Sequence, residues 1–232
     1  MHVIPSSLQF RDHIEKALQI SRLAITAELL LASLVIVLQV LGWTHAALIY
    51  LLVIALLSLW LRKIGRRELW FSCPERWKFT LLGGVIAGIA YQLISIVIVS
   101  PFLIKITGHS PDVSAFTGLR GNVTALLAAL VTSWTVAAFL EEFVFRGYLL
   151  NRITGLTSQT SVGWASGLLI SAAAFGSLHA YQGLPGAVDN LLFGLVLGGL
   201  FLAGRRSLWA PVIAHGVYDT TGFLLIFLGL VH

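Results

Sequence analysis

Several ionisable side chains lie inside stretches of this sequence that are otherwise apolar. Burying such a group in a bilayer costs about 2.5 to 3.5 kcal/mol on insertion scales, so each one needs a physical reason. A carboxylate can take a proton from water, an imidazole can share that work, and other donors can stabilise an oxyanion. Two histidines and three acids on three separate helices would suit a hydrolase if those helices converge. The whole set comprises Glu28, Glu141, Glu142, Arg146, His179, His215 and Asp219.

The spacing of the first cluster separates its two glutamates. Glu142 and Arg146 are four residues apart, so they share a helix face and can neutralise each other as a structural ion pair. Glu141 points about 100° away from its neighbour and is left for another partner. A catalytic role is one interpretation, and a protonated, hydrogen-bonded glutamate is the other.

The histidines also stand at helical spacing. His179 follows Phe175 by four residues, and His215 precedes Asp219 by four, so the second imidazole shares a helix face with a carboxyl group. A single histidine in a membrane helix also serves as a packed polar residue or a hydrogen bond between helices. The convergence of several such groups favours chemistry over packing.

The composition predicts the kind of fold that carries these ionisable side chains. Of the 232 residues, 57% are hydrophobic and 11% charged, and the mean hydropathy is +0.90. Residues 1–232 are therefore predicted to be a single membrane domain, an all-α polytopic transmembrane helix bundle of about seven to eight spans. The formal net charge of +5 comes from short basic clusters between apolar runs, which indicates membrane topology and no nucleic-acid partner. Cys73 is the one cysteine and cannot form an internal disulfide.

Basic clusters orient the bundle. The densest runs from Arg62 to Lys78 and predicts an integral protein of the cell (cytoplasmic) membrane with its N-terminus in the cytoplasm. In that topology Lys105 and Arg120 alone fall outside. Residues 1–22 predict an amphipathic segment on the membrane surface, with a solvated leader as the alternative. The expected spans are 23–43, 45–61, 79–104, 122–151, 162–179, 188–203 and 209–230.

Three motifs in the region 122–220 resemble those of the CAAX-protease and bacteriocin-processing family, also called Abi, whose members are intramembrane glutamate endopeptidases of the type II CAAX kind. Two glutamates, three residues and an arginine match positions 141–146. Phenylalanine, three residues and histidine match 175–179, and the last motif matches His215 to Asp219. Together these motifs are a specific signal, although each alone is weak.

The resemblance implies roles for the matched residues. Glu141 and His179 would activate the water, and His215 with Asp219 would stabilise the oxyanion. Glu142 and Arg146 would support the site, and no cofactor would be needed.

The last motif departs from the family pattern. The best-studied prenyl-protein members have asparagine where this chain has Asp219, and an ionised carboxylate cannot donate to an oxyanion. Asp219 could stay protonated; our hypothesis is that it orients His215. The substrate would be a peptide or protein, bare or lipidated, within membrane lipid; its identity and the oligomeric state are not predicted.

Three other functions stay open. A zinc-dependent membrane protease could use His179, His215 and a glutamate, with ligands from separate helices. Buried acids and histidines also form proton relays in transporters, and an immunity or scaffolding protein could keep the motifs without catalysis. The expected spans also raise a difficulty, because they place Glu141 toward the cytoplasmic end of its helix and His179 at the opposite end of the next. Either residues 151–165 form a re-entrant loop, or the span boundaries are wrong by several residues.

Overall fold

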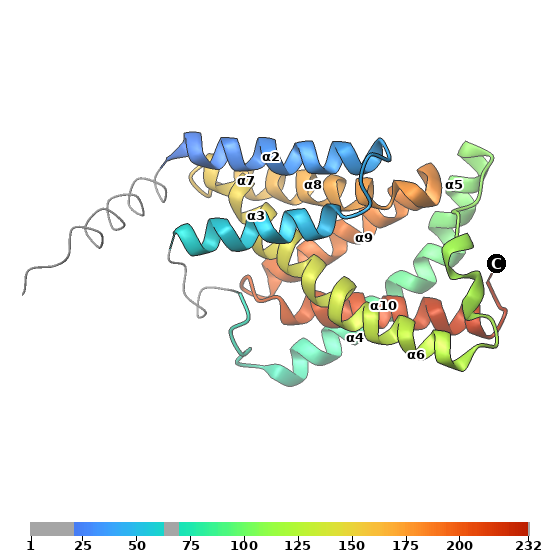
Figure 1. Ribbon diagram of the computed structural model, residues 1–232. Coiled ribbons are helices and arrows are strands. Elements are labelled where there is room, and N and C mark those ends of the chain that lie inside the picture. Colours follow the sequence, from blue (N-terminus) through green and yellow to red (C-terminus); the bar gives the residue numbers. More distant parts are fainter. Residues whose placement is uncertain (1–20, 63–69, 232) are drawn as a thin grey trace, which may run out of the picture.

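The computed structural model describes residues 21–62 and 70–231, and over these residues the chain is helical with no strand, as predicted (Figure 1). The predicted amphipathic segment 1–22 lies almost wholly outside the described residues.

The first two helices are α2 (Arg22–Val40) and α3 (Ala47–Leu61). The third is continuous through α4 (Trp77–Ile94), η2 (Ser95–Val99) and α5 (Ser100–Thr107). The fourth passes through α6 (Val123–Thr132), η4 (Ser133–Glu141), η5 (Phe143–Leu149) and α7 (Leu150–Leu156). The last three are α8 (Ser161–Leu178), α9 (Gly183–Ala203) and α10 (Trp209–Phe227), with the short η3 (Ser114–Leu119) and η6 (Ala180–Gln182) in the connections.

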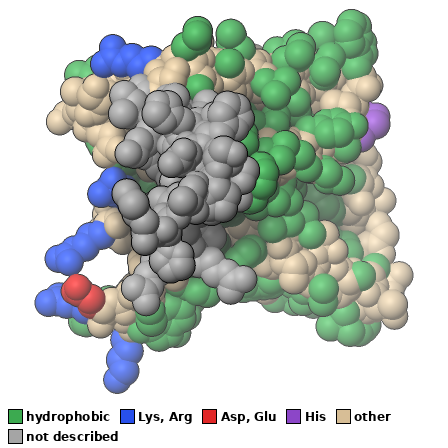
Figure 2. All heavy atoms as spheres, turned by 60° about the vertical axis from the view of Figure 1, so that its left-hand side comes forward, with side chains coloured by type: hydrophobic (Ala, Val, Ile, Leu, Met, Phe, Trp, Pro, Cys, Tyr) green, Lys and Arg blue, Asp and Glu red, His purple; other side chains and the backbone are tan. Residues whose placement is uncertain are grey.

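Six of these helices are long and apolar enough to cross a membrane, and α3 is a shorter apolar helix. Their outer faces expose many large apolar side chains, such as Leu23 (80%), Val97 (69%) and Phe79 (71%). Figure 2 shows how widely hydrophobic side chains cover one face of the molecule. Such a surface is stable in lipid and unfavourable in water, so the protein is an integral membrane protein.

The two ends of the bundle differ in charge. We call the end that carries residues 21–22, 62, 70–78, 157–160 and 204–208 the basic end, because Lys and Arg gather there (Figure 2). The other end carries residues 41–46, 108–122, 179–182 and 228–231, and we call it the loop end. In Figure 1 the basic end lies on the left, and the loop end lies on the right with the C-terminus.

Small residues allow the helices of the bundle to pack closely. A Cβ added at Gly88 of α4 would lie 2.5 Å from the carbonyl oxygen of Ala214 in α10. Gly176 of α8 similarly faces the backbone of α9 at Ala187. Close approach of this kind favours helix association in membranes, and it fixes the helices that carry the histidines.

The fourth helix is longer than predicted. It continues to Leu156, whereas the sequence predicted that it ends at residue 151. Glu141 therefore lies fifteen residues, or about 22 Å, before the turn, while His179 lies about 27 Å along the next helix from its start at Ser161. Both groups reach a similar depth, and the predicted conflict came from a wrong span boundary; the fifth helix starts where expected, and 151–156 is helical.

Pro101 lies within the third helix, where a proline commonly bends or ends a helix. It stands at the start of α5 and the helix continues to Thr107, so the proline does not end it. The helix preceding it is π-helical at Ser95–Val99, which is one way to absorb a backbone irregularity.

A polar cluster at the basic end joins α2 and α3 to the fourth helix. The Glu28 carboxylate pairs with Arg62 at 2.5 Å and with Arg152 at 3.6 Å. It also accepts hydrogen bonds from Ser58 (2.9 Å) and Tyr148 (3.0 Å). Glu28 had no assigned role in the sequence; these contacts indicate that it anchors the first two helices to the helix that carries Glu141.

Candidate active site

The fourth helix presents its two glutamates between two π-helical segments. These segments, Ser133–Glu141 and Phe143–Leu149, are separated by Glu142 alone. Every residue from Glu142 to Leu150 is buried, while Glu141 is partly exposed. π-helical turns inside longer helices recur at functional sites, and here they separate a buried glutamate from one that faces a cavity.

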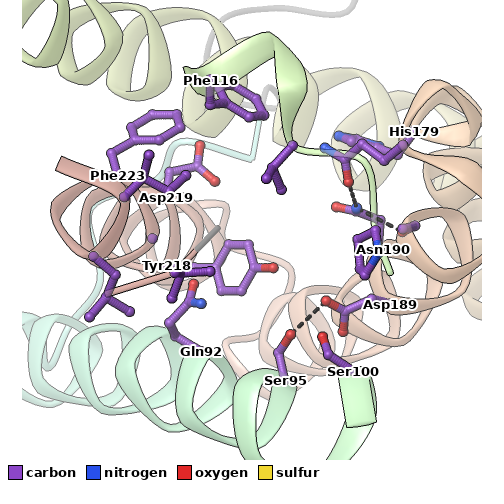
Figure 3. A pocket seen from close by; sticks show the side chains of 18 of the residues that line it. Gln92, Ser95, Ser100, Phe116, His179, Asp189, Asn190, Tyr218, Asp219 and Phe223 are labelled. Atoms are coloured by element: carbon purple, nitrogen blue, oxygen red, sulfur yellow. Dashed lines mark hydrogen bonds between the residues drawn. The ribbon is translucent and has the colours of Figure 1, made fainter. Parts of the chain in front are cut away.

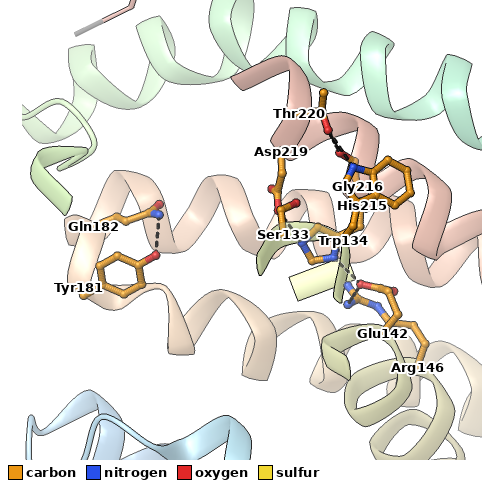
Figure 4. Close-up of polar contacts among 10 residues, drawn as sticks. All are labelled: Ser133, Trp134, Glu142, Arg146, Tyr181, Gln182, His215, Gly216, Asp219 and Thr220. Carbon is orange, nitrogen blue, oxygen red and sulfur yellow. Dashed lines mark hydrogen bonds and ion pairs between the residues drawn. The ribbon is translucent and has the colours of Figure 1, made fainter. Parts of the chain in front are cut away.

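Glu142 is bound on both sides (Figure 4). Its Oε1 accepts from Nη1 of Arg146 at 2.8 Å and lies 2.9 Å from Nδ1 of His215. Arg146 also donates to the carbonyl oxygen of Gly194 at 3.1 Å, and its guanidinium lies 4.5 Å from the centre of the Phe175 ring. The ion pair expected from the spacing is therefore present, and it also holds a histidine from another helix.

Glu141 has a different environment. Its carboxyl lines the cavity, and its Oε2 atom is buried without a hydrogen-bond partner among the described residues. Buried polar atoms without a partner are rare and call for a functional explanation. The sequence predicted that Glu141 does not share the Arg146 ion pair and has a different partner. In the structure its carboxyl lines the cavity, where a molecule in the cavity can bind it.

His179 ends α8 at the loop end. Its Nδ1 lies 2.9 Å from the backbone oxygen of Phe175. Because a carbonyl oxygen can only accept, Nδ1 carries the hydrogen and the neutral ring keeps its lone pair on Nε2. Phe175 is fully buried, and its ring contacts both His179 and His215, with centroid distances of 4.7 and 5.8 Å.

The last motif lies on α10. Oδ2 of Asp219 is 3.8 Å from Nε2 of His215, and it accepts a hydrogen bond from Ser133 at 2.8 Å. The closest carboxylate to the His215 ring is thus that of Glu142, and Asp219 approaches the opposite nitrogen. Gly216, inside the motif, leaves room for the Trp134 ring, since a Cβ there would lie 2.6 Å from it.

These groups meet in one cavity of about 630 Å³ (Figure 3). Glu141, His179, His215 and Asp219 all line it, and Glu142 and Arg146 lie behind its wall. In Figure 3 His179 and Asp219 stand on opposite sides of the space. Apolar side chains, including Ile104 and Phe116, line much of the remainder. A volume of this size accommodates several residues of an extended peptide or an apolar chain.

Asp189 is a cavity residue that the sequence analysis did not single out. It lies on α9, and its carboxylate accepts hydrogen bonds from Tyr91 at 2.8 Å and from Ser95 at 2.6 Å. Figure 3 shows the bond with Ser95. Asn190 beside Asp189 also lines the cavity. The signal was present, because Asp189 is an ionisable residue within an expected span, the same criterion that identified the other acids.

Among the described residues, no group of three or more histidine, cysteine, aspartate and glutamate side chains is arranged to hold a metal ion. His179 and His215 both line the cavity, but each already has an Nδ1 partner from the protein. Nε2 of His179 is thus left for a ligand or a reacting molecule, and Nε2 of His215 has the Asp219 carboxylate 3.8 Å away.

Fold and site together define a polytopic membrane protein whose cavity presents carboxyl and imidazole groups to a bound molecule. A family model described as type II CAAX prenyl endopeptidase Rce1-like matches residues 123–221. The match supports the resemblance seen in the three motifs: over this segment, which is less than half of the 232 residues, the sequence is similar to the type II CAAX prenyl endopeptidases. No curated protein and no solved structure matches the chain.

Proposed function

We propose that the protein is an intramembrane endopeptidase in which Glu141 activates the attacking water. The observation that carries this proposal is the contrast between the two adjacent glutamates. Glu142 is bound through Oε1 to Arg146 and His215, whereas the Glu141 carboxyl lines the cavity and its buried Oε2 has no protein partner among the described residues. Oε2 of Glu142 also lacks a partner there, but Glu142 is fully buried and does not line the cavity. A general base has to be free to bind the water from which it takes a proton.

His179 supports this role through its tautomer. With Nδ1 donating to the Phe175 carbonyl, Nε2 can accept a hydrogen bond from the same water. As the water attacks the scissile carbonyl, its proton passes to Glu141, and the carbonyl oxygen becomes an oxyanion. Collapse of the tetrahedral intermediate breaks the C–N bond, and the proton held by Glu141 passes to the leaving amine.

His215 would stabilise the oxyanion. Its Nδ1 donates to Glu142, so Nε2 can donate to the oxyanion only when the ring carries both protons. Asp219 lies near Nε2 at 3.8 Å and would stabilise that form of the ring until the oxyanion replaces it as the partner. This role for Asp219 requires no donation from an ionised carboxylate, and Ser133 would hold it in place.

The substrate class follows from the walls of the cavity. Apolar side chains from α5, α10 and the 108–119 segment face the polar groups, which suits an extended peptide with apolar residues or an attached lipid. Both bare and lipidated peptides are therefore to be compared as substrates.

The test is cleavage of a mixed library of apolar and prenylated peptides by protein purified in detergent. Glu141→Gln and His179→Ala are expected to abolish cleavage, and Glu75→Gln is the matched control, because Glu75 is exposed and paired only loosely with Arg205 at 3.7 Å. Each variant is measured with and without a strong zinc chelator.

Chelator-resistant cleavage that Glu141→Gln abolishes would support the proposal. Cleavage lost with chelator and restored by zinc would replace it with the zinc protease using His179 and His215. If folded wild-type protein cleaves no peptide, the proposal fails and the transporter and immunity functions become the leading explanations.

A further inference from the structure

The cavity communicates with one end of the bundle. The non-helical segments that line it are all at the loop end: Ser110, Pro111 and Val113 in the 108–119 segment, and Val231 near the C-terminus. Among the described residues, no lining residue comes from the segments that make up the basic end. The opening of the cavity is thus at the loop end.

Toward the basic end the cavity is closed by packed core. The fourth helix is buried continuously from Glu142 to Leu150. Phe193, Leu197 and Phe201 of α9 are fully buried against it, and Leu208 closes the same core before α10. Such a layer of close-packed side chains leaves no path for a peptide from the basic end.

The loop segments around the opening are fixed to one another. The backbone N–H of Asp112 donates to the carbonyl of Gln182 at 2.9 Å, and that of Gly121 donates to Phe227 at 3.1 Å. The Phe116 and Phe223 rings lie 5.4 Å apart at the rim. The opening is therefore bordered by three connected parts of the chain.

The distribution of charge then assigns the side of the membrane. The described part of the basic end carries Arg22, Arg62, Arg76, Lys78, Arg205 and Arg206, and the end of the fourth helix adds Arg152. The loop end carries Arg120, and Lys105 lies next to it in the last turn of α5. Since positively charged connections stay in the cytoplasm, the basic end is cytoplasmic by this criterion.

We infer that the active-site cavity opens to the extracytoplasmic face of the membrane, so that the protein acts on peptides presented from that side or from the outer leaflet. The cavity and the charge distribution carry this inference without any assumption about catalysis. That the molecules entering the cavity are peptide substrates rests on the proposed function.

The single native cysteine provides one half of the test. Cys73 is exposed at the basic end, and a membrane-impermeant cationic thiol reagent should modify it in inverted vesicles and leave it unmodified in right-side-out vesicles. For the other half, Ala137→Cys in a Cys73→Ser background places a thiol on the cavity wall one turn before Glu141. Ala138→Cys is the matched control, since Ala138 is fully buried and does not line the cavity.

The expected result is modification of Ala137→Cys in right-side-out vesicles, loss of that modification in inverted vesicles, and no modification of Ala138→Cys in either. Modification of Ala137→Cys only in inverted vesicles would overturn the inference, as would modification of Cys73 and Ala137→Cys from the same side.

A second measurement adds a peptide too polar to cross the membrane to right-side-out vesicles. Cleavage, and its loss once the reagent has modified Ala137→Cys, is expected if the proposed function also holds. Correct labelling without any cleavage in either type of vesicle would refute the protease and leave the side of access established. Cleavage only in inverted vesicles would refute the extracytoplasmic substrate.

Discussion

Replacing Glu142 by glutamine should damage both the stability and the catalytic rate of this protein. The carboxylate is fully buried, and one oxygen serves both Arg146 and His215. A neutral amide keeps the shape and removes the charge that balances Arg146. The guanidinium would then retain the Gly194 carbonyl at 3.1 Å and the ring of Phe175 as partners.

The magnitude follows from the burial of the pair. Removing one member of a buried ion pair costs about 3 to 5 kcal/mol, and the two remaining partners of Arg146 place Glu142→Gln near the lower figure. Arg146→Met should cost a similar amount. Because the two changes remove the same interaction, the double variant should cost about 1 to 3 kcal/mol less than the sum of the single variants.

The catalytic rate constant distinguishes a role of Glu142 in orienting His215 from a role in folding. Glu142→Gln weakens the bond that orients His215, so kcat of the folded enzyme should fall by about ten- to a hundredfold while KM changes little, as for other partners that orient a reacting group. Arg146→Met leaves the bond between Glu142 and His215 in place and should reduce kcat less. Unfolding titrations in mixed detergent micelles give the free energies, and peptide cleavage gives kcat and KM.

Additive costs within about 0.5 kcal/mol would refute the coupling of Glu142 with Arg146. Equal losses of kcat in the two single variants would refute the positioning of His215 by Glu142, because a purely structural pair would affect catalysis equally through either member.

Substitutions at three further sites, Asp219, Gly88 and Glu28, test separate parts of the structure. Asp219→Asn should preserve or raise cleavage, because the amide can donate to the oxyanion directly and so compensates for the lost charge beside His215, and Asp219→Ala should abolish it; full activity of the alanine variant would show that the side chain has no role. Gly88→Ala should destabilise the protein by about 1 to 3 kcal/mol in micelle titrations, because its Cβ would meet the Ala214 carbonyl, whereas Gly83→Ala faces open space and should be neutral or slightly stabilising. Glu28→Gln should cost about 1 to 3 kcal/mol of stability, from the loss of charge-assisted bonds, and leave kcat unchanged, and a large loss of kcat would mean that this cluster also shapes the site.

Hydropathy and caps predicted most of the fold. The fourth span was predicted to begin at residue 122, which is an asparagine, a residue type that caps helices. Its side chain accepts a hydrogen bond from the backbone N–H of Ala125 at 3.1 Å. The end of that helix was missed because the charged residue Arg152 follows the apolar run and nevertheless lies within the helix. Its partner, Glu28, lies on α2, and a contact between such distant residues leaves no mark on local periodicity.

The site shows the same limit. Spacing on one helix predicted the pair of Glu142 with Arg146, because residues four apart are neighbours in any helix. It could not predict that Glu142 also binds His215, since that contact depends on how α10 packs against the rest of the bundle. The roles that the family resemblance implies for Glu141, His179, His215 and Asp219 remain predictions, and the shared cavity is the reason to test them together.

The division between Glu141 and Glu142 also explains why two adjacent acids can stand in one membrane helix. Two ionised carboxylates side by side in a medium of low dielectric constant would repel each other and lose hydration. Arg146 and His215 offset the charge of Glu142 from two directions, and the cavity offers Glu141 contact with a polar molecule. The buried pair therefore makes the neighbouring free carboxyl tolerable, and a change at Glu142 should alter the chemistry at Glu141 even though the two side chains point to different surroundings.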